Sequence, residues 1–159
     1  MPRDPDHNYQ AVIAAPGFCL GVRCDEREIH AIEFLEPSPE VPPANALAGE
    51  TACQLRAYLS DPDFVFELPQ RPSGTSFQRR VWAQIAAIPG RQTRTYGDLA
   101  KTLHNAPRAV GQACGANPFP LIVPCHRVVA AGGGLGGFAR HGGGFLLDVK
   151  RWLLTHEGR

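Results

Sequence analysis

The dipeptide Cys125-His126 is the feature of this sequence that could most directly do chemistry. It lies between two short apolar runs, Leu121-Ile122-Val123 and Val128-Val129. A cysteine thiolate is a nucleophile, and a nearby imidazole can accept the proton of the thiol. Adjacent side chains on a strand point to opposite faces, so the imidazole reaches the thiol only at a tight turn or through a bridging water. From the dipeptide alone, a buried structural cysteine beside a core histidine is the more frequent arrangement.

Two predicted helices precede this dipeptide and are typical of a helix-turn-helix. They span residues 96–103 and 108–116, with Thr95 as N-cap of the first and Pro107 in the first turn of the second. The second helix has small outer side chains. Its outer positions are Arg108, Ala109, Gly111, Gln112, Gly115 and Ala116. Since a helical glycine costs about 1 kcal/mol relative to alanine, this surface indicates a close approach, either by a DNA groove or by another helix.

The distribution of charge favours a polyanionic partner for the second half of the chain. The net charge is +1, but residues 1–73 carry five Arg and twelve Asp or Glu, a net charge of −7. Residues 74–159 carry eleven Lys or Arg and three Asp or Glu, a net charge of +8. A phosphate-binding surface needs such a local excess of positive charge, so nucleic acid is the favoured partner.

Composition indicates a soluble globular chain. Apolar residues make up 43% and charged residues 19%, which excludes an intrinsically disordered chain. Purely apolar stretches are only a few residues long and the N-terminus has no apolar signal core, so we expect no membrane segment and no secretion. The five cysteines are an odd, scattered set, which argues against a disulfide framework and for the reducing cytoplasm. Cys19, Cys24 and His30 do not have the spacing of a zinc site, so no metal is expected.

The first half of the sequence predicts a small antiparallel sheet with a helix. Strands are expected at Ala11–Ala14, Phe18–Val22 and Ile29–Leu35, separated by turn signals. A helical pattern then runs from Ala44 to the stop at Asp61-Pro62, and Phe64–Leu68 is expected to form one more short strand.

The second half is predicted to be mostly helical. A helix begins near Thr75, with Thr75 or Ser73 as its cap, and ends at Pro89-Gly90. The glycine-rich segment 132–144 is expected to form a mobile lip beside a site, before a final helix from about Leu147 to His156. The fold class is therefore α+β: a small N-terminal antiparallel sheet with a helix in residues 1–73, and a mostly helical domain with the helix-turn-helix and the cysteine in residues 74–159.

Six ordered motifs make a specific family resemblance. They are Thr75-Ser76-Phe77-Gln78-Arg79-Arg80-Val81-Trp82, Thr95-Tyr96-Gly97, Arg108-Ala109-Val110-Gly111, Asn117-Pro118, Pro124-Cys125-His126-Arg127-Val128-Val129 and Trp152-Leu153-Leu154-Thr155-His156-Glu157-Gly158. Together they resemble the O6-alkylguanine-DNA alkyltransferases, also called methylated-DNA–protein-cysteine methyltransferases. The match is strong over residues 74–159 and extends to residues 10–70 only in layout.

The resemblance implies a suicide DNA repair enzyme. Such a protein transfers the alkyl group, usually methyl, from O6-alkylguanine, and we expect also from O4-alkylthymine, to its own cysteine and reacts once. The partner would be double-stranded DNA, bound in the minor groove with the damaged base flipped out. No metal or organic cofactor is expected, because the lesion itself is the alkyl donor. We further expect a monomer in solution, no membrane association, and a cytoplasmic location, or a nuclear one if the source is a eukaryote.

The resemblance also implies roles for the reacting residues. Cys125 matches the alkyl acceptor, and His126 matches the base that acts on it through a water. Glu157 would orient the imidazole and stabilise its charge, as in a catalytic triad. Asn117 would hold the turn around the cysteine.

Further positions match the base pocket and the DNA interface of the family. Tyr96 matches a phenol that donates a proton to the guanine as it leaves, and Pro124 and Val128 complete the base pocket. The carbonyls of Cys125 and Val128 would read the exocyclic amine of the guanine. Arg108 would fill the gap left by the flipped base. The residues matched to DNA binding are Thr95, Tyr96, Arg108, Ala109, Gly111 and Gln112.

The sequence departs from the family pattern in two places, and other classes of protein stay open. The segment 137–152 is longer than the usual family loop, and Gly115-Ala116 lacks an arginine often found there. The alternatives are a non-catalytic alkylbase-binding protein, a helix-turn-helix regulator and a cysteine hydrolase. The first carries a tryptophan where this chain has Cys125, and the second needs longer side chains on its reading helix. The third would turn over repeatedly.

Overall fold

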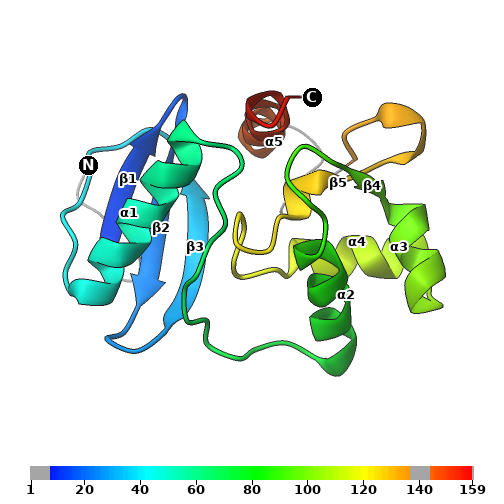
Figure 1. Cartoon of the computed structure of the whole chain (residues 1–159), viewed down its shortest axis with the longest axis horizontal. Coiled ribbons are helices and arrows are strands. Elements are labelled where there is room, and N and C mark those ends of the chain that lie inside the picture. The colour runs from blue at the N-terminus through cyan, green and yellow to red at the C-terminus, as the bar shows by residue number, and fades with distance from the viewer. Residues whose placement is uncertain (1–7, 137–143, 159) are drawn as a thin grey trace. The chain divides into compact units, whose positions relative to one another are not determined.

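The computed structural model describes residues 8–136 and 144–158. The chain divides into two compact units, Met1–Arg71 and Pro72–Arg159. Within the described residues, none of the helices is both long enough and apolar enough to cross a bilayer. The architecture is α+β, as the sequence predicts (Figure 1).

The N-terminal unit is a three-stranded antiparallel meander covered by one helix. Strands β1 (Ala11–Ala15), β2 (Phe18–Cys24) and β3 (Ile29–Leu35) pair in the order β1-β2-β3. Helix α1 (Ala46–Ser60) packs on β1 and β2 (Figure 1). Asn45 caps α1 by accepting a hydrogen bond from the backbone N–H of Ala48 at 2.8 Å. These elements confirm the predicted strands and helix.

The expected strand at Phe64–Leu68 is wrong: in the described part of the chain these residues pair with no strand, and only the later Gln70 forms an isolated bridge, to Ile29. The side chain of Gln54, on α1, takes the place of such a neighbour. Its Nε2 donates to the carbonyl of Glu67 at 3.0 Å, and its Oε1 accepts from the Glu67 N–H at 2.9 Å. The segment is thus held in place by one side-chain amide rather than by a ladder, and apolar alternation alone does not distinguish the two.

Three helices build the first part of the C-terminal unit. Helix α2 (Ser76–Ala86) begins at Thr75, which forms a capping box with Gln78. Helices α3 (Tyr96–Leu103) and α4 (Pro107–Gly115) follow, and α3 begins at a second capping box made by Thr95. Between them His104 adopts φ 54°, the left-handed conformation that ends α3. The structure therefore confirms the predicted helix-turn-helix.

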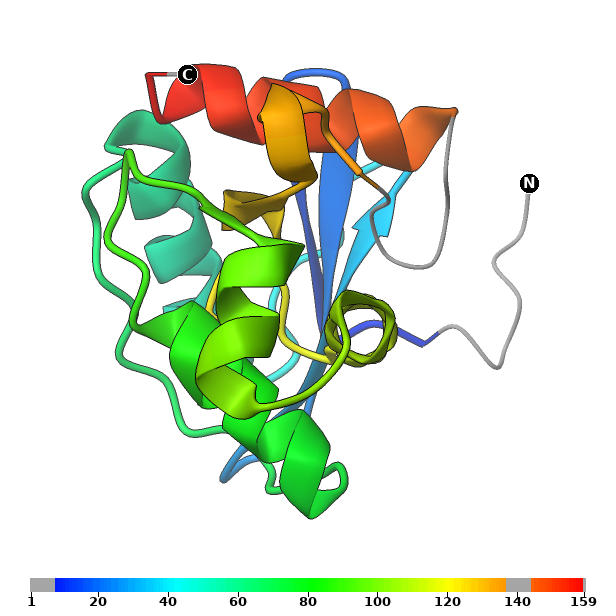
Figure 2. The same ribbon diagram turned by 90° about the vertical axis from the view of Figure 1, so that its right-hand side faces the viewer.

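The packing of α4 fixes its orientation within this unit. Trp82 of α2 is buried and donates its indole N–H to the carbonyl of Ala113 on α4 at 2.9 Å. Val110 and Ala113 face the core, while α4 runs across α3 and is seen almost end on in Figure 2. One side of α4 is therefore held by packing, while Arg108 and Gln112 on its other side are exposed.

The chain then forms a compact turn and a final helix. Strand β5 (Val128–Val129) pairs in parallel with β4 (Arg94–Thr95), a pairing that the sequence did not predict. A 3₁₀ turn at Cys125–Arg127 precedes β5, and a second at Ala131–Gly133 follows it. Helix α5 (Phe145–His156) closes the unit. The expected mobile lip at 132–144 lies largely outside the described residues, since 137–143 are not described.

Candidate active site

Cys125 is the first residue of the 3₁₀ turn rather than part of a strand. The turn is closed by two hydrogen bonds, from the N–H of Arg127 to the Pro124 carbonyl at 2.9 Å and from the N–H of Val128 to the Cys125 carbonyl. Cys125 is 5% exposed and His126 1% exposed. The turn therefore places a buried thiol and a buried imidazole on consecutive residues of a 3₁₀ turn.

Asn117 holds the sulfur of Cys125. Its Nδ2 donates to Cys125 Sγ at 3.2 Å and to the carbonyl of Val123 at 2.9 Å. Its Oδ1 accepts from the N–H of Phe119 at 2.9 Å. Because the oxygen is engaged by a backbone donor, the NH₂ group must face the sulfur. Asn117 thus presents a hydrogen-bond donor to the atom on which negative charge would develop.

His126, Glu157 and Arg127 form a buried ionic network. His126 Nε2 donates to Glu157 Oε2 at 2.8 Å, and Glu157 is 1% exposed. Arg127 binds the same carboxylate with two donors, Nε to Oε1 at 2.9 Å and Nη2 to Oε2 at 3.0 Å. Its Nη1 donates to the carbonyl of Ile88 at 2.8 Å. A buried carboxylate is costly unless it is paired, and here three charge-assisted hydrogen bonds compensate it.

The network also determines the tautomer and the charge of the His126 imidazole. A carboxylate can only accept, so Nε2 of His126 carries the hydrogen and Nδ1 is the basic nitrogen. Among the described residues, Nδ1 is buried without a hydrogen-bond partner. Burial lowers the pKa of His126, while the hydrogen bond and charge of Glu157 oppose that shift. The imidazole is therefore neutral at pH 7 and has its basic nitrogen available.

A second thiol and an ammonium group lie close to Cys125. The hydrogen bond with Cys114 is the main cause that raises the pKa of Cys125, and burial adds to it. The hydrogen bond with Cys125 in turn lowers the pKa of Cys114. The Lys150 ammonium lowers the pKa of both thiols more weakly. At rest, Cys125 is a protonated thiol that needs a base before it can act as a nucleophile.

Lys150 connects two segments beside the thiols. Its side chain is fully buried, and Nζ donates to the carbonyls of Val128 at 2.8 Å and Leu135 at 2.6 Å. Burial lowers the pKa of Lys150 to about 8. The carbonyls of Cys125 and Val128 each already accept one hydrogen bond. Each keeps a second lone pair, which a ligand amine could use.

Tyr96, the first residue of α3, forms part of the same region. Burial raises the pKa of Tyr96, and the Lys150 Nζ lies 5.8 Å from the centre of its ring. Gly136, at φ +69°, packs so closely on this ring that a Cβ there would lie 2.7 Å from Cε2. The tyrosine is thus held as a neutral phenol between α5 and the segment after β5.

The outer face of α4 is shaped for close approach. Arg108 and Gln112 are exposed, while Ala109 and Gly111 are half-buried. A Cβ built on Gly111 would meet no atom within 4 Å. Packing among the described residues therefore does not require a glycine at position 111, and they give no support to the helix-packing alternative there.

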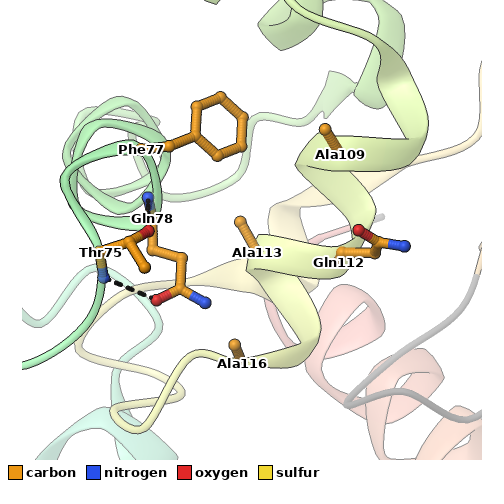
Figure 3. Close-up of a pocket in the computed structure, with 7 residues that line it drawn as sticks. All are labelled: Thr75, Phe77, Gln78, Ala109, Gln112, Ala113 and Ala116. Carbon is orange, nitrogen blue, oxygen red and sulfur yellow. Dashed lines mark hydrogen bonds between the residues drawn. The ribbon is translucent and has the colours of Figure 1, made fainter.

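A groove of about 470 Å³ runs between the start of α2 and α4 (Figure 3). It is lined by Thr75, Phe77, Gln78, Ala109, Gln112, Ala113 and Ala116. Phe77 points toward Ala109, whereas Gln112 points away from α2 (Figure 3). Three of the four side chains that line this groove from α4 and its C-cap are alanines, so they leave room beside this edge of the helix.

One acidic cluster in the N-terminal unit could hold a cation. Asp25, Glu28 and His30 bring three ligand atoms within 4.8 Å of one another. The Asp25 carboxylate already accepts from the N–H groups of Arg27 and Glu28 and pairs with His30 Nε2 at 3.0 Å. These contacts account for the cluster as a loop-stabilising arrangement.

The structure brings together several, but not all, of the candidate site residues. Cys125 contacts Asn117, and His126 contacts Glu157, although neither pair is adjacent in the sequence. Tyr96 lies in the same electrostatic neighbourhood as the thiol. Of the remaining candidates, Thr95 ends β4 and caps α3, and Pro124 and Val128 flank the 3₁₀ turn. The others lie on α4: Arg108, Ala109, Gly111 and Gln112.

Three residues with clear contacts were missed from the sequence. Arg127 is adjacent to the Cys-His pair, and Cys114 lies on α4 among small side chains. Lys150 lies on the inward stripe of α5 that Leu147 and Leu154 continue. A basic residue on an apolar helical stripe was the signal that could have revealed Lys150.

Comparisons with known proteins show the family to which this chain is similar. Residues 76–159 match the family described as 6-O-methylguanine DNA methyltransferase, DNA binding domain. A methylated-DNA–protein-cysteine methyltransferase of Methanosarcina acetivorans is 37% identical over 158 residues, which cover 94% of this chain and 98% of that protein. A protein of the same name from Shigella flexneri is 37% identical over 164 residues, covering 92% and 93%.

Solved structures show the same fold. The O6-methylguanine methyltransferase of Mycobacterium tuberculosis has a TM-score of 0.78 and 34% identity, covering 92% of this chain and 90% of that one. The structure of that protein in complex with DNA matches equally well. With the family match over more than half of the chain and relatives aligned over nearly their full lengths, this chain belongs to the methylated-DNA–protein-cysteine methyltransferase family.

Proposed function

We propose that Cys125 is the alkyl acceptor of this protein. As a member of its family, the chain is a DNA repair enzyme that directly transfers an alkyl group from methylated DNA to a cysteine of its own. The observation that supports Cys125 is its surroundings: Asn117 donates to the sulfur at 3.2 Å, and the next residue belongs to the buried His126–Glu157 pair. None of the other four cysteines is next to a histidine in the sequence.

In this proposal, His126 removes the thiol proton. Nδ1 is the basic nitrogen, and a water between it and the sulfur would carry the proton. The imidazolium that forms is stabilised by the Glu157 carboxylate, which Arg127 holds in place with two hydrogen bonds. The Asn117 amide stabilises the thiolate as it forms. The sulfur lone pair then attacks the alkyl carbon, and the bond between that carbon and O6 of guanine breaks.

The departing guanine needs a proton, and Tyr96 is the proposed donor. Burial raises the pKa of its phenol, so the hydroxyl stays protonated at neutral pH. Donation to the base neutralises the negative charge that gathers on the leaving group. Pro124 and Val128 would line the base pocket, with the Cys125 and Val128 carbonyls facing the exocyclic amine.

We also propose that α4 enters the minor groove of the duplex. The support is Gly111, beside which a Cβ would meet no atom of the described residues within 4 Å, together with the excess of basic residues in 74–159. Ala109 and Gln112 would lie along the groove, Thr95 and Tyr96 would contact the strand, and Arg108 would occupy the gap left by the flipped base. Residues 1–73 would act as scaffold and residues 74–159 would bind DNA as a monomer.

Each molecule reacts once, because a thioether does not readily release its alkyl group. The decisive experiment is the mass of the protein after incubation with a duplex containing O6-methylguanine. One methyl group should appear on the tryptic peptide that contains Cys125, and Cys125→Ala should bind the duplex without gaining mass. Cys53→Ser, which removes an exposed cysteine on α1, is the matched control and should react like the wild type. Methyl transfer to Cys125→Ala would overturn the assignment.

A duplex with O4-methylthymine tests the second substrate in the same assay. We expect transfer to the same cysteine, because the chemistry at the methyl carbon is identical. Transfer to O6-methylguanine alone would restrict the substrate to guanine.

A further inference from the structure

Arg127 holds a fixed positive charge beside the proposed base, His126. Its side chain is 11% exposed, and each of its three guanidinium nitrogens donates a hydrogen bond. Nε and Nη2 donate to the two oxygens of Glu157, at 2.9 and 3.0 Å, and Nη1 donates to the carbonyl of Ile88 at 2.8 Å. The guanidinium is therefore fastened to the end of α5 on one side and to the residues that follow α2 on the other.

We propose that Arg127 is a positioning residue for alkyl transfer, which fixes the Glu157 carboxylate on His126 and offsets its negative charge, so that the imidazole stays neutral and can accept a proton. The effect on the imidazole follows from the contacts of these three side chains. Its consequence for repair rests also on the proposed role of His126 as base, so the two are tested by separate measurements.

The net charge of the buried group decides which form of the imidazole is favoured. His126 and Glu157 are each 1% exposed, arginine is effectively always charged, and burial disfavours an unpaired charge. With Arg127 present, a neutral imidazole leaves a balanced pair, whereas an imidazolium adds an uncompensated positive charge. Without Arg127 the order reverses, because Glu157 beside a neutral imidazole is an uncompensated negative charge that one additional proton neutralises.

The position of that additional proton determines what happens to the base. On the imidazole, it gives a ring with hydrogens on both nitrogens. On Oε2 of Glu157, it is donated to Nε2, and the ring hydrogen moves to Nδ1. On Oε1, it faces the side chain that replaces Arg127, and beside an apolar side chain the hydroxyl has no partner and is costly. In both favourable arrangements Nδ1 carries a hydrogen, so it has no lone pair for the thiol proton.

Among the described residues, Lys150 of α5 is the other cation that acts on His126. Burial has the largest effect and lowers the pKa of His126, Glu157 raises it, and the positive charges of Arg127 and Lys150 lower it. Lys150 is the same in all of the variants below, so differences among them report on Arg127 and Glu157.

NMR can measure the protonation of His126 without any alkyl transfer. The chain has six histidines, and the His126 imidazole resonances are those that are missing from His126→Gln. The full chain is titrated between about pH 5 and 9. In Arg127→Met, the midpoint of His126 should lie at least about one pH unit above that of the wild type, since a nearby charge shifts a pKa by about 1–3 units. If Arg127→Met does not fold, Arg127→Gln should shift the midpoint in the same direction, because its amide can still donate to Glu157 but has no charge.

Three further variants distinguish the offset of charge from general damage to the site. Arg127→Lys keeps the charge but cannot bind both oxygens, so the midpoint should stay within about half a pH unit of the wild type. The double variant Arg127→Met, Glu157→Gln has no unpaired carboxylate, and its midpoint should lie at least about one unit below that of Arg127→Met. Arg151→Met is the matched control, since it removes an exposed arginine paired with Asp148, and the midpoint should not move.

The second measurement is single-turnover transfer from duplex O6-methylguanine as a function of pH. In each variant, the acid limb of the rate profile should move with the NMR midpoint, whereas loss of packing alone would lower the plateau and leave the limb in place. A His126 that titrates in the folded Arg127→Met or Arg127→Gln as it does in the wild type would overturn the inference. A midpoint that shifts while the acid limb does not would overturn the role of His126 as base, and with it the part of Arg127 in transfer, but not the effect of Arg127 on the imidazole.

Discussion

Replacing Glu157 with glutamine should show how much the buried ionic network contributes to the rate of alkyl transfer and to stability. Gln has the same shape, but it has no charge and only one accepting oxygen. That oxygen can keep the place of Oε2, which accepts from His126 and from Arg127 Nη2. The amide NH₂ then faces Arg127 Nε, which donates to Oε1 at 2.9 Å in the wild type. Two donors therefore meet at a buried position, and the imidazolium loses its counter-charge.

The expected losses follow from burial. Glu157 is 1% exposed and the Arg127 side chain 11%, so water cannot replace the lost partner. Breaking a buried ion pair from one side typically costs about 3–5 kcal/mol in the free energy of unfolding. The rate of alkyl transfer should fall by roughly 10²–10³-fold, within the range of about 10²–10⁴ that general base catalysis contributes.

The pH dependence identifies the cause of the slower transfer. Burial lowers the pKa of His126, so wild-type activity should be lost only as pH falls through a value below the ordinary 6.5. Because the Glu157 charge raises that pKa, the variant should keep its activity plateau to a still lower pH, at a lower maximum. A purely structural defect would reduce the rate without moving the acid limb.

Rapid-quench measurement of a single turnover on duplex O6-methylguanine, from pH 4.5 to 8, gives the maximal transfer rate and the pH at which activity is lost. Circular dichroism must show that the variant is folded at each pH. Asp148→Asn is the matched control, since it also removes a carboxylate from the α5 region, but an exposed one paired with Arg151. We expect this control to change rate and stability little, as surface pairs do. If a folded Glu157→Gln transferred methyl within threefold of the wild type, the base role of the His126–Glu157 pair would be refuted.

Three further substitutions test other parts of the proposal. Gly111→Leu should slow transfer from duplex DNA at least about tenfold by blocking the groove contact, while the rate of transfer from the free modified base and the stability of the fold stay unchanged. If the variant and the wild type reacted with the duplex at equal rates, the placement of α4 would be contradicted. Arg108→Ala should slow transfer from duplex more than from the free base, and equal slowing of both would count against its gap-filling role. Lys150 has a pKa of about 8 in the folded protein and 10.5 in the unfolded chain, so the folded protein loses this proton at lower pH. Between pH 8 and 10.5 the wild-type free energy of unfolding should therefore rise by about 3 kcal/mol relative to that of Lys150→Met. Denaturant titrations that show parallel pH profiles for the two proteins would contradict a buried ammonium at this position.

Local signals in the sequence were sufficient for most of the secondary structure. The sequence predicts Thr95 as one helix cap and Thr75 or Ser73 as another, and Thr95 and Thr75 both form capping boxes in the structure. A cap depends on residues three apart, which the sequence displays directly. Phe64–Leu68 does not form a strand, because a strand needs a partner strand, and here the Gln54 side chain on the preceding helix α1 holds the segment instead.

Family membership could likewise be predicted from ordered motifs, but the site network could not be derived from the residues alone. The His126–Glu157 and Asn117–Cys125 pairs entered through the resemblance, and the structure shows both as hydrogen bonds. Arg127 belongs to one of the motifs, but the resemblance implies no role for it. Its bond to Glu157, 30 positions away, depends on how α5 meets the 3₁₀ turn.

By itself the sequence determined the α+β layout, the helix-turn-helix, the charge excess of the second half and the chemical nature of the Cys-His pair. These properties depend on residue type and on spacings of a few positions. Only the tertiary structure decided that Lys150 is buried against two carbonyls and that Arg127 pairs with Glu157. Such contacts join segments far apart in the chain, and their cost or benefit arises from burial, which a linear pattern does not encode.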